Sequence, residues 1–296
     1  MAVRRRSKEM GETKGLIETT PHEQAEDLAG RIRSVLHTTT FGQQMIVLPR
    51  TGSTNDVARE LAGQGAREGT IVLAEEQTAG RGRLQRRWLA PPGTCLLLSI
   101  LFRPRLPLDQ AQWLTALCAM AAADAIETVA GLHVGLKWPN DLIVRQSALQ
   151  TLSRAGRKLA GVLTETGVMG NRLDYLIVGI GINVNVPTDA LATLSPEATS
   201  ILAETGRTTD RATLLATLLL NVEERYRRLY TGEHPRAEWT RRLVTVGQSV
   251  CATSGAVAIQ GIAEAVDETG ALLIRTVGGQ VHRLVAGDAT LSTQGT

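Results

Sequence analysis

Three shortages in the sequence exclude whole classes of protein: it has few cysteines, few aromatic residues and no long apolar run. Its 296 residues include only Cys95, Cys118 and Cys251, which lie far apart and form no C-x-x-C pair. That spacing argues against a disulfide framework and against a zinc site, and it is typical of a reducing cytoplasm. Aromatic residues make up 3% of the chain, so few rings are available for nucleic-acid bases to stack on.

The apolar stretches and the charge balance exclude further classes. Stretches such as Cys95–Phe102 are much shorter than the roughly 20 residues of a membrane span. The basic start of the chain, residues 1–6, lacks the apolar segment of a secretory signal behind it. Basic residues number 32 and acidic residues 29, too even a balance to predict a nucleic-acid-binding surface. We therefore expect a cytoplasmic protein that binds neither a membrane nor DNA.

Lysine and the familiar catalytic motifs are scarce as well. Only Lys8, Lys14, Lys137 and Lys158 are lysines, which leaves 28 arginines, so the two lysines of the expected folded body are candidates for specific roles. The chain has no P-loop, no G-x-G-x-x-G after a strand, no H-E-x-x-H and no G-x-S-x-G. What remains is positive charge that can surround a polyanion, which suits phosphoryl or adenylyl transfer.

Composition and periodicity divide the chain into three parts. Residues 1–40 mix charges without sustained periodicity and are expected to form a flexible tail, with at most a short helix at Ile32–Leu36. Residues 41–244 are expected to form the main domain, with a β-rich centre and long helices. Residues 245–296 carry five short alternating runs separated by glycine-containing turns, which predict a small β-barrel.

Local patterns give the expected elements of the main domain. Strands are expected at Met45–Pro49, Ile71–Glu76, Thr94–Phe102, Val134–Trp138, Leu142–Val144, Leu159–Thr166 and Leu173–Asn185. Helices are expected after Ser53, from Asp109 to Gly131, and over Thr209–Tyr230. Asp56, three residues beyond Ser53, gives the first helix a start similar to a capping box.

The densest chemical signal is the segment Glu75–Trp88. Gly80 and Gly82 allow its backbone to approach a ligand closely. Four arginines with no acidic residue among them supply forked donors for carboxylate or phosphate oxygens; they are Arg81, Arg83, Arg86 and Arg87. We expect their mutual repulsion to hold this loop open until an anion binds. A solvated hairpin tip and an RNA-binding patch are the alternatives.

Three further segments place polar groups beside expected strands. In Lys137–Asp141, proline fixes a turn that presents a cation, an amide and a carboxylate for a nucleotide and its metal; the alternative is a turn that satisfies only its own backbone. Lys158 opens the strand that leads to Gly161. In Gly179-x-Gly181-x-Asn183 the glycines indicate close packing against a ligand or another backbone, with Asn183 on the same face. A core strand with glycines for sheet packing is the alternative.

In their order, these motifs resemble those of a biotin protein ligase (biotin–acetyl-CoA-carboxylase ligase). The matching motifs are Ser53-Thr54-Asn55, Gln77 to Arg83 with Trp88, Lys137 to Asp141, Lys158 to Gly161, Gly179-x-Gly181-x-Asn183, and Ala198 to Ile201. With the terminal strands, the resemblance covers about residues 41–296. It implies an α+β fold, with a central mixed β-sheet flanked by helices, similar to class II synthetases, and a small C-terminal SH3-like β-barrel.

The resemblance also implies a two-step reaction. Biotin and Mg²⁺-ATP form biotinyl-5′-AMP and pyrophosphate. An acceptor lysine on a biotin carboxyl carrier protein, part of acetyl-CoA carboxylase or of another biotin-dependent carboxylase, then attacks the mixed anhydride. That amine has an ordinary pKa of about 10.4 and must lose a proton; no residue is clearly placed as the base, and Asp141 is the candidate.

Site residues are implied in the same way. Those implied to bind biotin are Ser53, Thr54, Asn55, Gln77, Gly80, Arg81, Gly82, Arg83, Lys158 and Gly161. Those implied to bind the nucleotide are Arg83, Arg86, Trp88, Lys137, Asn140, Asp141, Lys158 and Asn183. Arg83 and Lys158 are the implied catalytic residues, because they offset the repulsion between biotin's carboxylate and ATP. The chain itself is expected to supply no metal site.

The sequence departs from the family pattern in two places. Leu84-Gln85 replaces the basic residue and glycine expected there. From this difference we expect the ordering of the loop and the retention of the adenylate to differ from those of the family. Val186–Pro196 lacks an aromatic residue to stack on adenine. About 40 residues before the main domain are too few for the winged helix-turn-helix of some members, so the form without a DNA-binding domain is expected. An edge strand of the central sheet is a candidate homodimer contact.

Two alternatives stay open. A lipoate or octanoate ligase or transferase of the same superfamily would need a longer apolar slot and no partners for a ureido ring, against which Gln77 and Ser53-Thr54-Asn55 argue. A nucleic-acid-binding regulator would use the tail arginines and the loop, and its binding to duplex DNA would depend on salt.

Overall fold

A computed structural model of the protein describes residues 20–145, 156–170, 172–254, 257–285 and 287–291. Its centre is a seven-stranded mixed sheet with the order β1-β2-β3-β7-β6-β5-β4. In that order the strands are β1 (Met45–Leu48), β2 (Ile71–Ala74), β3 (Cys95–Phe102), β7 (Arg172–Asn183), β6 (Arg157–Met169), β5 (Asp141–Val144) and β4 (Gly135–Lys137). β1 and β2 pair in parallel and the other pairs are antiparallel. The expected α+β arrangement is confirmed.

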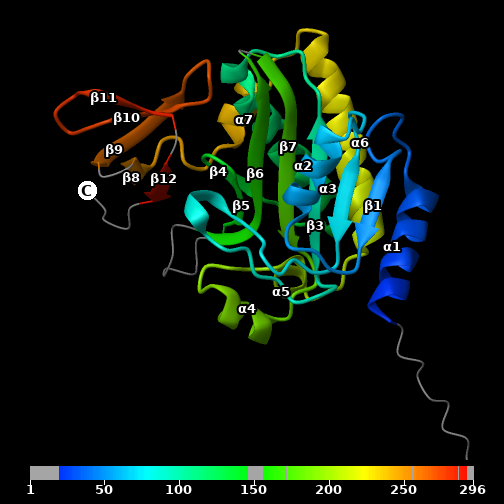
Figure 1. Ribbon diagram of the computed structural model, residues 1–296. Coiled ribbons are helices and arrows are strands. Elements are labelled where there is room, and N and C mark those ends of the chain that lie inside the picture. Colours follow the sequence, from blue (N-terminus) through cyan, green and yellow to red (C-terminus); the bar gives the residue numbers. More distant parts are fainter. Residues whose placement is uncertain (1–19, 146–155, 171, 255–256, 286, 292–296) are drawn as a thin grey trace, which may run out of the picture.

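Helices cover both faces of this sheet (Figure 1). On one face lie α3 (Gln112–Ala130), which packs mainly over β6, and α6 (Arg211–Tyr230), which packs over β3. Alternate residues of β3 such as Leu96 and Leu98 belong to the core on this face. On the other face α2 (Thr54–Gly63) packs through Ala58 and Ala62 against Leu101 and its neighbours. Successive residues of a strand point to opposite faces, and a strand covered on both faces is apolar throughout. This accounts for the full burial of β3.

The helix α3 corrects one expectation. Together with the preceding turn η2 (Leu108–Gln110) it forms a segment of 23 residues, Leu108–Ala130, that contains an 18-residue window with a mean hydropathy of 1.3. By length and composition alone, this segment could cross a membrane. Such stretches were not expected. However, 72% of its most apolar window is buried inside the fold, and it packs against both the sheet and α6. It is the central core helix of the main domain.

The expected flexible tail is wrong for the residues from Thr20 onward, while residues 1–19 lie outside the described part. Pro21–Val35 forms a helix, α1, that begins with a capping box between Thr20 and Glu23. Ala25, Leu28, Ala29 and Ile32 are buried, and α1 contacts α6 and β1 (Figure 1). The segment that follows it is fixed too, because the Glu223 carboxylate of α6 accepts hydrogen bonds from the backbone of residues 39–41.

The five C-terminal strands are present, but they form an open antiparallel sheet with the order β11-β10-β9-β8-β12. They are β8 (Ser249–Ser254), β9 (Val257–Val266), β10 (Leu272–Arg275), β11 (Val281–Leu284) and β12 (Asp288–Leu291). No pairing between β11 and β12 closes a barrel within the described strands. The remaining helices are short: η1 (Arg83–Gln85), α4 (Thr188–Leu194), α5 (Ile201–Thr205) and α7 (Arg236–Arg242).

Two tryptophans of the main domain fasten this C-terminal sheet. Trp113 Nε1 donates to the carbonyl of Glu268 at 3.2 Å, and Trp138 Nε1 donates to that of Gly270 at 3.0 Å. Both carbonyls belong to the turn between β9 and β10. Because the two indoles are only 1% exposed, the C-terminal sheet is part of the main domain's packing.

Candidate active site

The motifs singled out in the sequence converge on one cavity of about 260 Å³. The predicted site residues that line it are Ser53, Thr54, Asn55, Gln77, Arg81, Gly82, Arg83, Arg86, Trp88, Asn140, Asp141, Lys158, Gly161 and Asn183. They come from the start of α2, from the segment after β2, and from β5, β6 and β7. A volume near the lower end of the roughly 300–1,000 Å³ of small-molecule pockets fits a compact ligand.

Two predicted site residues, Gly80 and Lys137, do not line the cavity. Lys137 ends β4, the outermost strand of the sheet, and lies opposite Asp141 across a tight turn. Gly80 accepts a hydrogen bond from Trp88 N, and a Cβ at this position would lie 2.7 Å from Trp88 O. Glycine is therefore required there by the neighbouring backbone.

One end of the cavity, here called the ring end, is made of neutral polar groups from Ser53, Thr54, Asn55 and Gln77. The Gln77 Oε1 atom accepts hydrogen bonds from Thr54 N at 2.7 Å and Thr54 Oγ1 at 3.1 Å, which leaves its NH₂ group as the donor. The Asn55 Oδ1 atom accepts from the buried Ser99 Oγ at 2.6 Å. Among the described residues Asn55 Nδ2 is buried without a hydrogen-bond partner, and such an orphan donor indicates a ligand acceptor.

The expected capping box at Ser53 is not formed. α2 begins after Ser53, as expected, but the Ser53 side chain makes no cap hydrogen bond. Asp56, its expected companion, is turned instead toward two arginines. The hydroxyl of Ser53 thus remains at the cavity wall.

Glycines on β6 and β7 make room for site side chains. Gly179 and Gly181 line the cavity together with Asn183, as the shared face predicts, and Gly161 lies opposite Gly181 on β6. A Cβ at Gly179 would collide with Asn55 Oδ1, and one at Gly181 would lie 2.6 Å from the Trp88 ring. The close packing expected at these glycines is thus against Asn55 and Trp88.

The arginine-rich segment is a hairpin, here called the arginine hairpin (Gly80–Trp88). Gly82 N donates to Arg86 O at 2.7 Å, Trp88 N donates to Gly80 O at 2.9 Å, and Arg81 and Arg87 form a β-bridge. At its tip Leu84 and Gln85 have φ angles of 53° and 61°, a region costly for residues other than glycine. Leu84-Gln85 is also the first of the two places at which the sequence departs from the pattern of the family it resembles.

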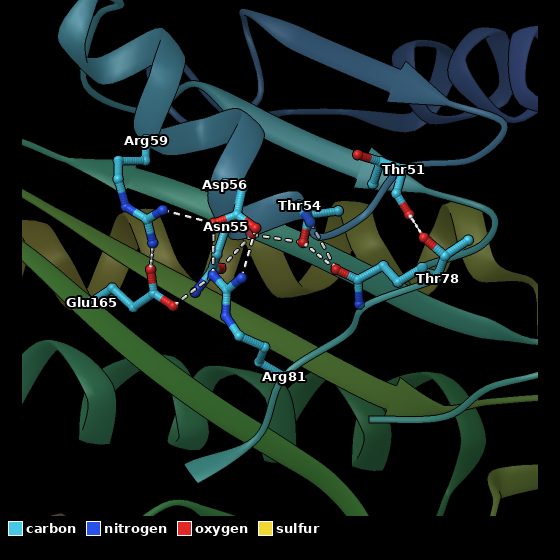
Figure 2. Close-up of polar contacts among 10 residues, drawn as sticks. Thr51, Thr54, Asn55, Asp56, Arg59, Thr78, Arg81 and Glu165 are labelled. Atoms are coloured by element: carbon cyan, nitrogen blue, oxygen red, sulfur yellow. Dashed lines mark hydrogen bonds and ion pairs between the residues drawn. The ribbon is translucent and has the colours of Figure 1, made fainter. Parts of the chain in front are cut away.

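The mutual repulsion expected among the four arginines is offset at Arg81, because α2 and β6 supply its counter-charges. Arg81 donates to both carboxylate oxygens of Asp56, at 2.6 and 2.8 Å, and to Glu165 Oε1 at 3.0 Å (Figure 2). Arg59 joins the same two carboxylates. These hydrogen bonds, above all those from Arg81, hold the pKa of the Asp56 carboxyl below its usual value of 3.8.

The other end of the cavity, here called the cation end, is organised around Lys158. Its Nζ lies 2.7 Å from Asp141 Oδ1 and 5.7 Å from the centre of the Trp88 ring. Its backbone pairs with the segment around Ala198, through bonds from Lys158 N to Glu197 O and from Thr199 N to Lys158 O. Arg83 and Arg86 of the arginine hairpin line the same cavity, so its wall carries cationic groups from the hairpin as well as from β6, and these are included in the name cation end.

Asn140 and Asn183 are held by backbone carbonyls. Asn140 Nδ2 donates to Val162 O at 2.6 Å, and Asn183 Nδ2 donates to Thr199 O at 2.9 Å. The Asn183 Oδ1 atom also accepts a hydrogen bond from Cys95 Sγ at 3.6 Å, so the side-chain oxygen of Asn140 is the one that remains for a ligand. Within the described residues no group of three acidic, histidine or cysteine side chains is arranged to hold a metal ion, although Asp141 supplies a carboxylate at the cation end.

Sequence reasoning missed other residues of the cavity wall. Leu194 ends α4, Ser195 and Glu197 follow it, and Gly287 directly precedes β12 of the C-terminal sheet. None of them belongs to a motif with its own chemistry, and Gly287 lies 89 positions beyond Ala198, the next lining residue along the chain. The one available signal for Leu194, Ser195 and Glu197 was their position next to residues 198–201, which resemble a segment of the family.

Comparisons with known proteins match this arrangement. The family described as "Biotin/lipoate A/B protein ligase family" matches residues 47–183, and the one described as "Biotin protein ligase C terminal domain" matches residues 245–292. The bifunctional ligase/repressor BirA of Bacillus spizizenii is 36% identical over 263 residues, 88% of this chain and 78% of that protein. The biotin--[acetyl-CoA-carboxylase] ligase of Mycobacterium tuberculosis is 32% identical over 254 residues, 83% of this chain and 88% of that protein.

A solved structure is similar over most of the chain. The biotin protein ligase from Aquifex aeolicus in complex with biotin and ATP matches with a TM-score of 0.67 and 28% identity, covering 84% of this chain and 99% of that one.

Proposed function

The chain belongs to the biotin protein ligase family, and from this we infer that it attaches biotin to a lysine of a biotin carrier protein in an ATP-dependent reaction. The observation that carries this inference is the polarity of the cavity. Its ring end offers neutral hydroxyl and amide groups, and its cation end offers Lys158 and arginines of the arginine hairpin. Biotin has the same two ends, a neutral ureido ring and a carboxylate.

We propose that the ring end binds the ureido group. The orphan donor Asn55 Nδ2 and the NH₂ group of Gln77 suit the ureido oxygen, and the hydroxyl of Ser53 suits a ureido N–H. A lipoyl group has no ureido ring and would leave these buried polar groups without partners, which is costly. The ring end therefore favours biotin over lipoate or octanoate.

In the first step a carboxylate oxygen of biotin attacks the α-phosphorus of ATP, and pyrophosphate leaves. We propose that Lys158 and Arg83 neutralise the two repelling acids and the charge that develops in the transition state. Arg86, Trp88, Asn140, Asp141 and Asn183 are proposed to hold the nucleotide. Mg²⁺ would be bound by ATP phosphates together with Asp141, because Mg²⁺ is commonly held by one or two carboxylates plus phosphates; it would neutralise phosphate charge.

In the second step the amine of the acceptor lysine attacks the carbonyl of the mixed anhydride, an amide forms, and AMP leaves. The names of the relatives support a carrier protein of acetyl-CoA carboxylase as the acceptor, and we propose that this or another biotin-dependent carboxylase is the partner. We further propose a cytoplasmic location and no membrane partner.

We also propose that the chain does not bind DNA as a repressor. In support, Ala25, Leu28 and Ile32 of α1 are buried against the main domain, so these residues do not belong to a separate DNA-reading module. A homodimer through an edge of the central sheet remains a proposal, tested by sedimentation with and without biotin and ATP.

Transfer of labelled biotin to a carrier-protein fragment tests the function. With ATP the expected result is one biotin per acceptor lysine and release of pyrophosphate, with no lipoate attached to a lipoyl domain under the same conditions. Lipoylation in place of biotinylation would contradict the proposal. Salt-dependent binding to duplex DNA that survives removal of residues 1–40 would instead support a regulator.

A further inference from the structure

We propose that Asp56 and Glu165 are positioning residues that act through Arg81: they anchor the arginine hairpin beside the cavity, and Arg81 is an anchor rather than a ligand for biotin's carboxylate. The inference rests on the proposed function for the identity of the ligand. None of the sequence motifs includes Asp56 or Glu165 in a role at the site, and neither residue lines the cavity.

The geometry of Arg81 carries the proposal. Its guanidinium makes a two-pronged contact with Asp56 on α2 and a third hydrogen bond to Glu165 on β6 (Figure 2). A guanidinium offers five N–H donors in a fixed fork, and these contacts direct it at two carboxylates. With Arg59 included, two arginines face two acids, so the charge of Arg81 is already balanced by the protein.

The contacts of Arg81 also determine the position of the rest of the arginine hairpin. Arg81 forms the β-bridge with Arg87, and the hairpin's two strands continue to Arg83 on one side and Trp88 on the other. Fixing Arg81 to α2 and β6 therefore fixes the direction from which Arg83 and Arg86 enter the cation end. Loss of the anchor would free the tip, where Leu84 and Gln85 already have unfavourable φ angles.

The first experiment is tryptic digestion of the full-length protein in the absence of substrates. Trypsin cleaves after Arg83, Arg86 and Arg87, so the rate at which hairpin peptides appear measures anchoring. Asp56→Asn and Glu165→Gln should each raise this rate about tenfold, because each removes a charge-assisted contact. Asp56→Glu, which keeps the charge, should restore part of the protection.

A second experiment measures how fast biotinyl-5′-AMP leaves the enzyme. Asp56→Asn should increase the dissociation rate of the adenylate about tenfold, and adding Asp56→Asn to an Arg81→Ala variant should change nothing further. If Arg81 bound the ligand directly, Asp56→Asn would leave retention unchanged or improve it, and the two substitutions would act independently. Either of those results overturns the proposal.

The chain offers a matched control. Asp124 and Glu238 face Arg225 and Arg242 in a second group of two acids and two arginines, and none of the four lines the cavity. Asp124→Asn should alter thermal stability without changing hairpin digestion or adenylate release, and equal effects of the two asparagine variants would refute the anchor. A wild-type protein that forms no biotinyl-5′-AMP would refute the proposed function instead, since the digestion experiment needs no substrate.

Discussion

At the scale of single residues, the proposed chemistry depends most on Lys158. Its ammonium group lies at the cation end, 2.7 Å from Asp141 Oδ1, and its backbone is fixed on both sides by the segment Glu197–Thr199. A cation held in this way does not need to reorganise when negative charge develops beside it, which is the condition for strong transition-state stabilisation.

Replacing Lys158 by alanine should therefore lower the rate of biotinyl-5′-AMP formation by about 10²- to 10³-fold, the usual effect of removing one such group. The measurement is pyrophosphate release in a single turnover. Lys137→Ala is the matched control, because Lys137 lies outside the cavity and its removal should leave the rate within about twofold. A near-normal rate in Lys158→Ala would contradict the assigned role.

Gly181 supports a second prediction at this scale. A methyl group there would push into the Trp88 ring, and overpacking of this kind costs about 1–3 kcal/mol. Gly181→Ala should displace Trp88, change its fluorescence and shorten retention of the adenylate. Trp88 is a usable reporter because the other tryptophans, Trp113, Trp138 and Trp239, are 1% exposed and do not line the cavity.

The double variant decides what Gly181 does. In a Trp88→Ala background, Gly181→Ala should cost little, because the ring that it would meet is gone. An equal cost with and without Trp88 would mean that Gly181 is needed by the ligand itself.

Some residues of the site could be predicted from the sequence, and others could not. Those inside motifs were found because glycine, arginine, lysine and asparagine lie close together along the chain. Asp56 and Glu165 were missed as partners because they lie 25 and 84 positions from Arg81, and an isolated acid on a helix or strand carries no signal of its own. For Gly181 the sequence predicted close packing against a ligand or another backbone. It could not indicate that the packing partner is the ring of Trp88, because Trp88 lies far away along the chain.

At the scale of elements, α3, α6 and α7 are joined by the second acid–arginine group. Arg225 of α6 donates to Glu238 of α7 at 2.8 Å and to Asp124 of α3 at 2.5 Å. The hydrogen bonds from Arg225, more than any other contact, hold the pKa of the Glu238 carboxyl below its usual value of 4.5.

This shift predicts a pH dependence of stability. A carboxyl whose pKa is lower in the folded state stabilises that state above its ordinary pKa, and the contribution is lost as the pH falls through the folded value. Glu238→Gln should therefore lower the free energy of unfolding by about 1 kcal/mol at pH 7, discounted for partial exposure, and the difference from wild type should shrink below a pH of about 4.5. Urea unfolding between neutral and acid pH measures it, and a difference that is constant across this range would contradict the prediction.

The helices that sequence reasoning missed share a physical reason. The buried stripe of α1 consists of two alanines, one leucine and one isoleucine among charged residues, so its periodicity is weak. α4, α5 and α7 have 7, 5 and 7 residues, which is too short to establish a helical repeat. The long helices and every strand of the central sheet were predicted because burial imposes a sustained pattern on them.

At the scale of the whole molecule, the C-terminal sheet and the main domain form one packed unit. The turn that holds the two indoles is itself organised by Asp267, whose Oδ1 accepts hydrogen bonds from Thr269 N at 2.8 Å and Ala271 N at 3.0 Å. The sequence predicted the five strands but neither their open arrangement nor this contact, because both depend on pairings between distant residues.

Asp267→Ala should release that turn, destabilise the protein by about 1–3 kcal/mol, and shift tryptophan emission to longer wavelength as Trp113 and Trp138 lose their packing. Thermal unfolding followed by fluorescence is the measurement. Glu264→Ala is the control in the same sheet, because its exposed ion pair with Arg275 contributes little. Equal losses from the two substitutions would mean that the turn does not fasten the sheet.

The start of α2 brings two tasks together in consecutive residues. Thr54 and Asn55 belong to the ring end, and the next residue, Asp56, holds Arg81. Anyone who redesigns this turn so that the enzyme accepts a different vitamin analogue will thus also alter how long the reactive intermediate is kept from escaping. Substrate selectivity and retention of the adenylate therefore depend on neighbouring residues. Variants that are screened for selectivity alone will release more of the adenylate, which then reacts with lysines of proteins other than the acceptor.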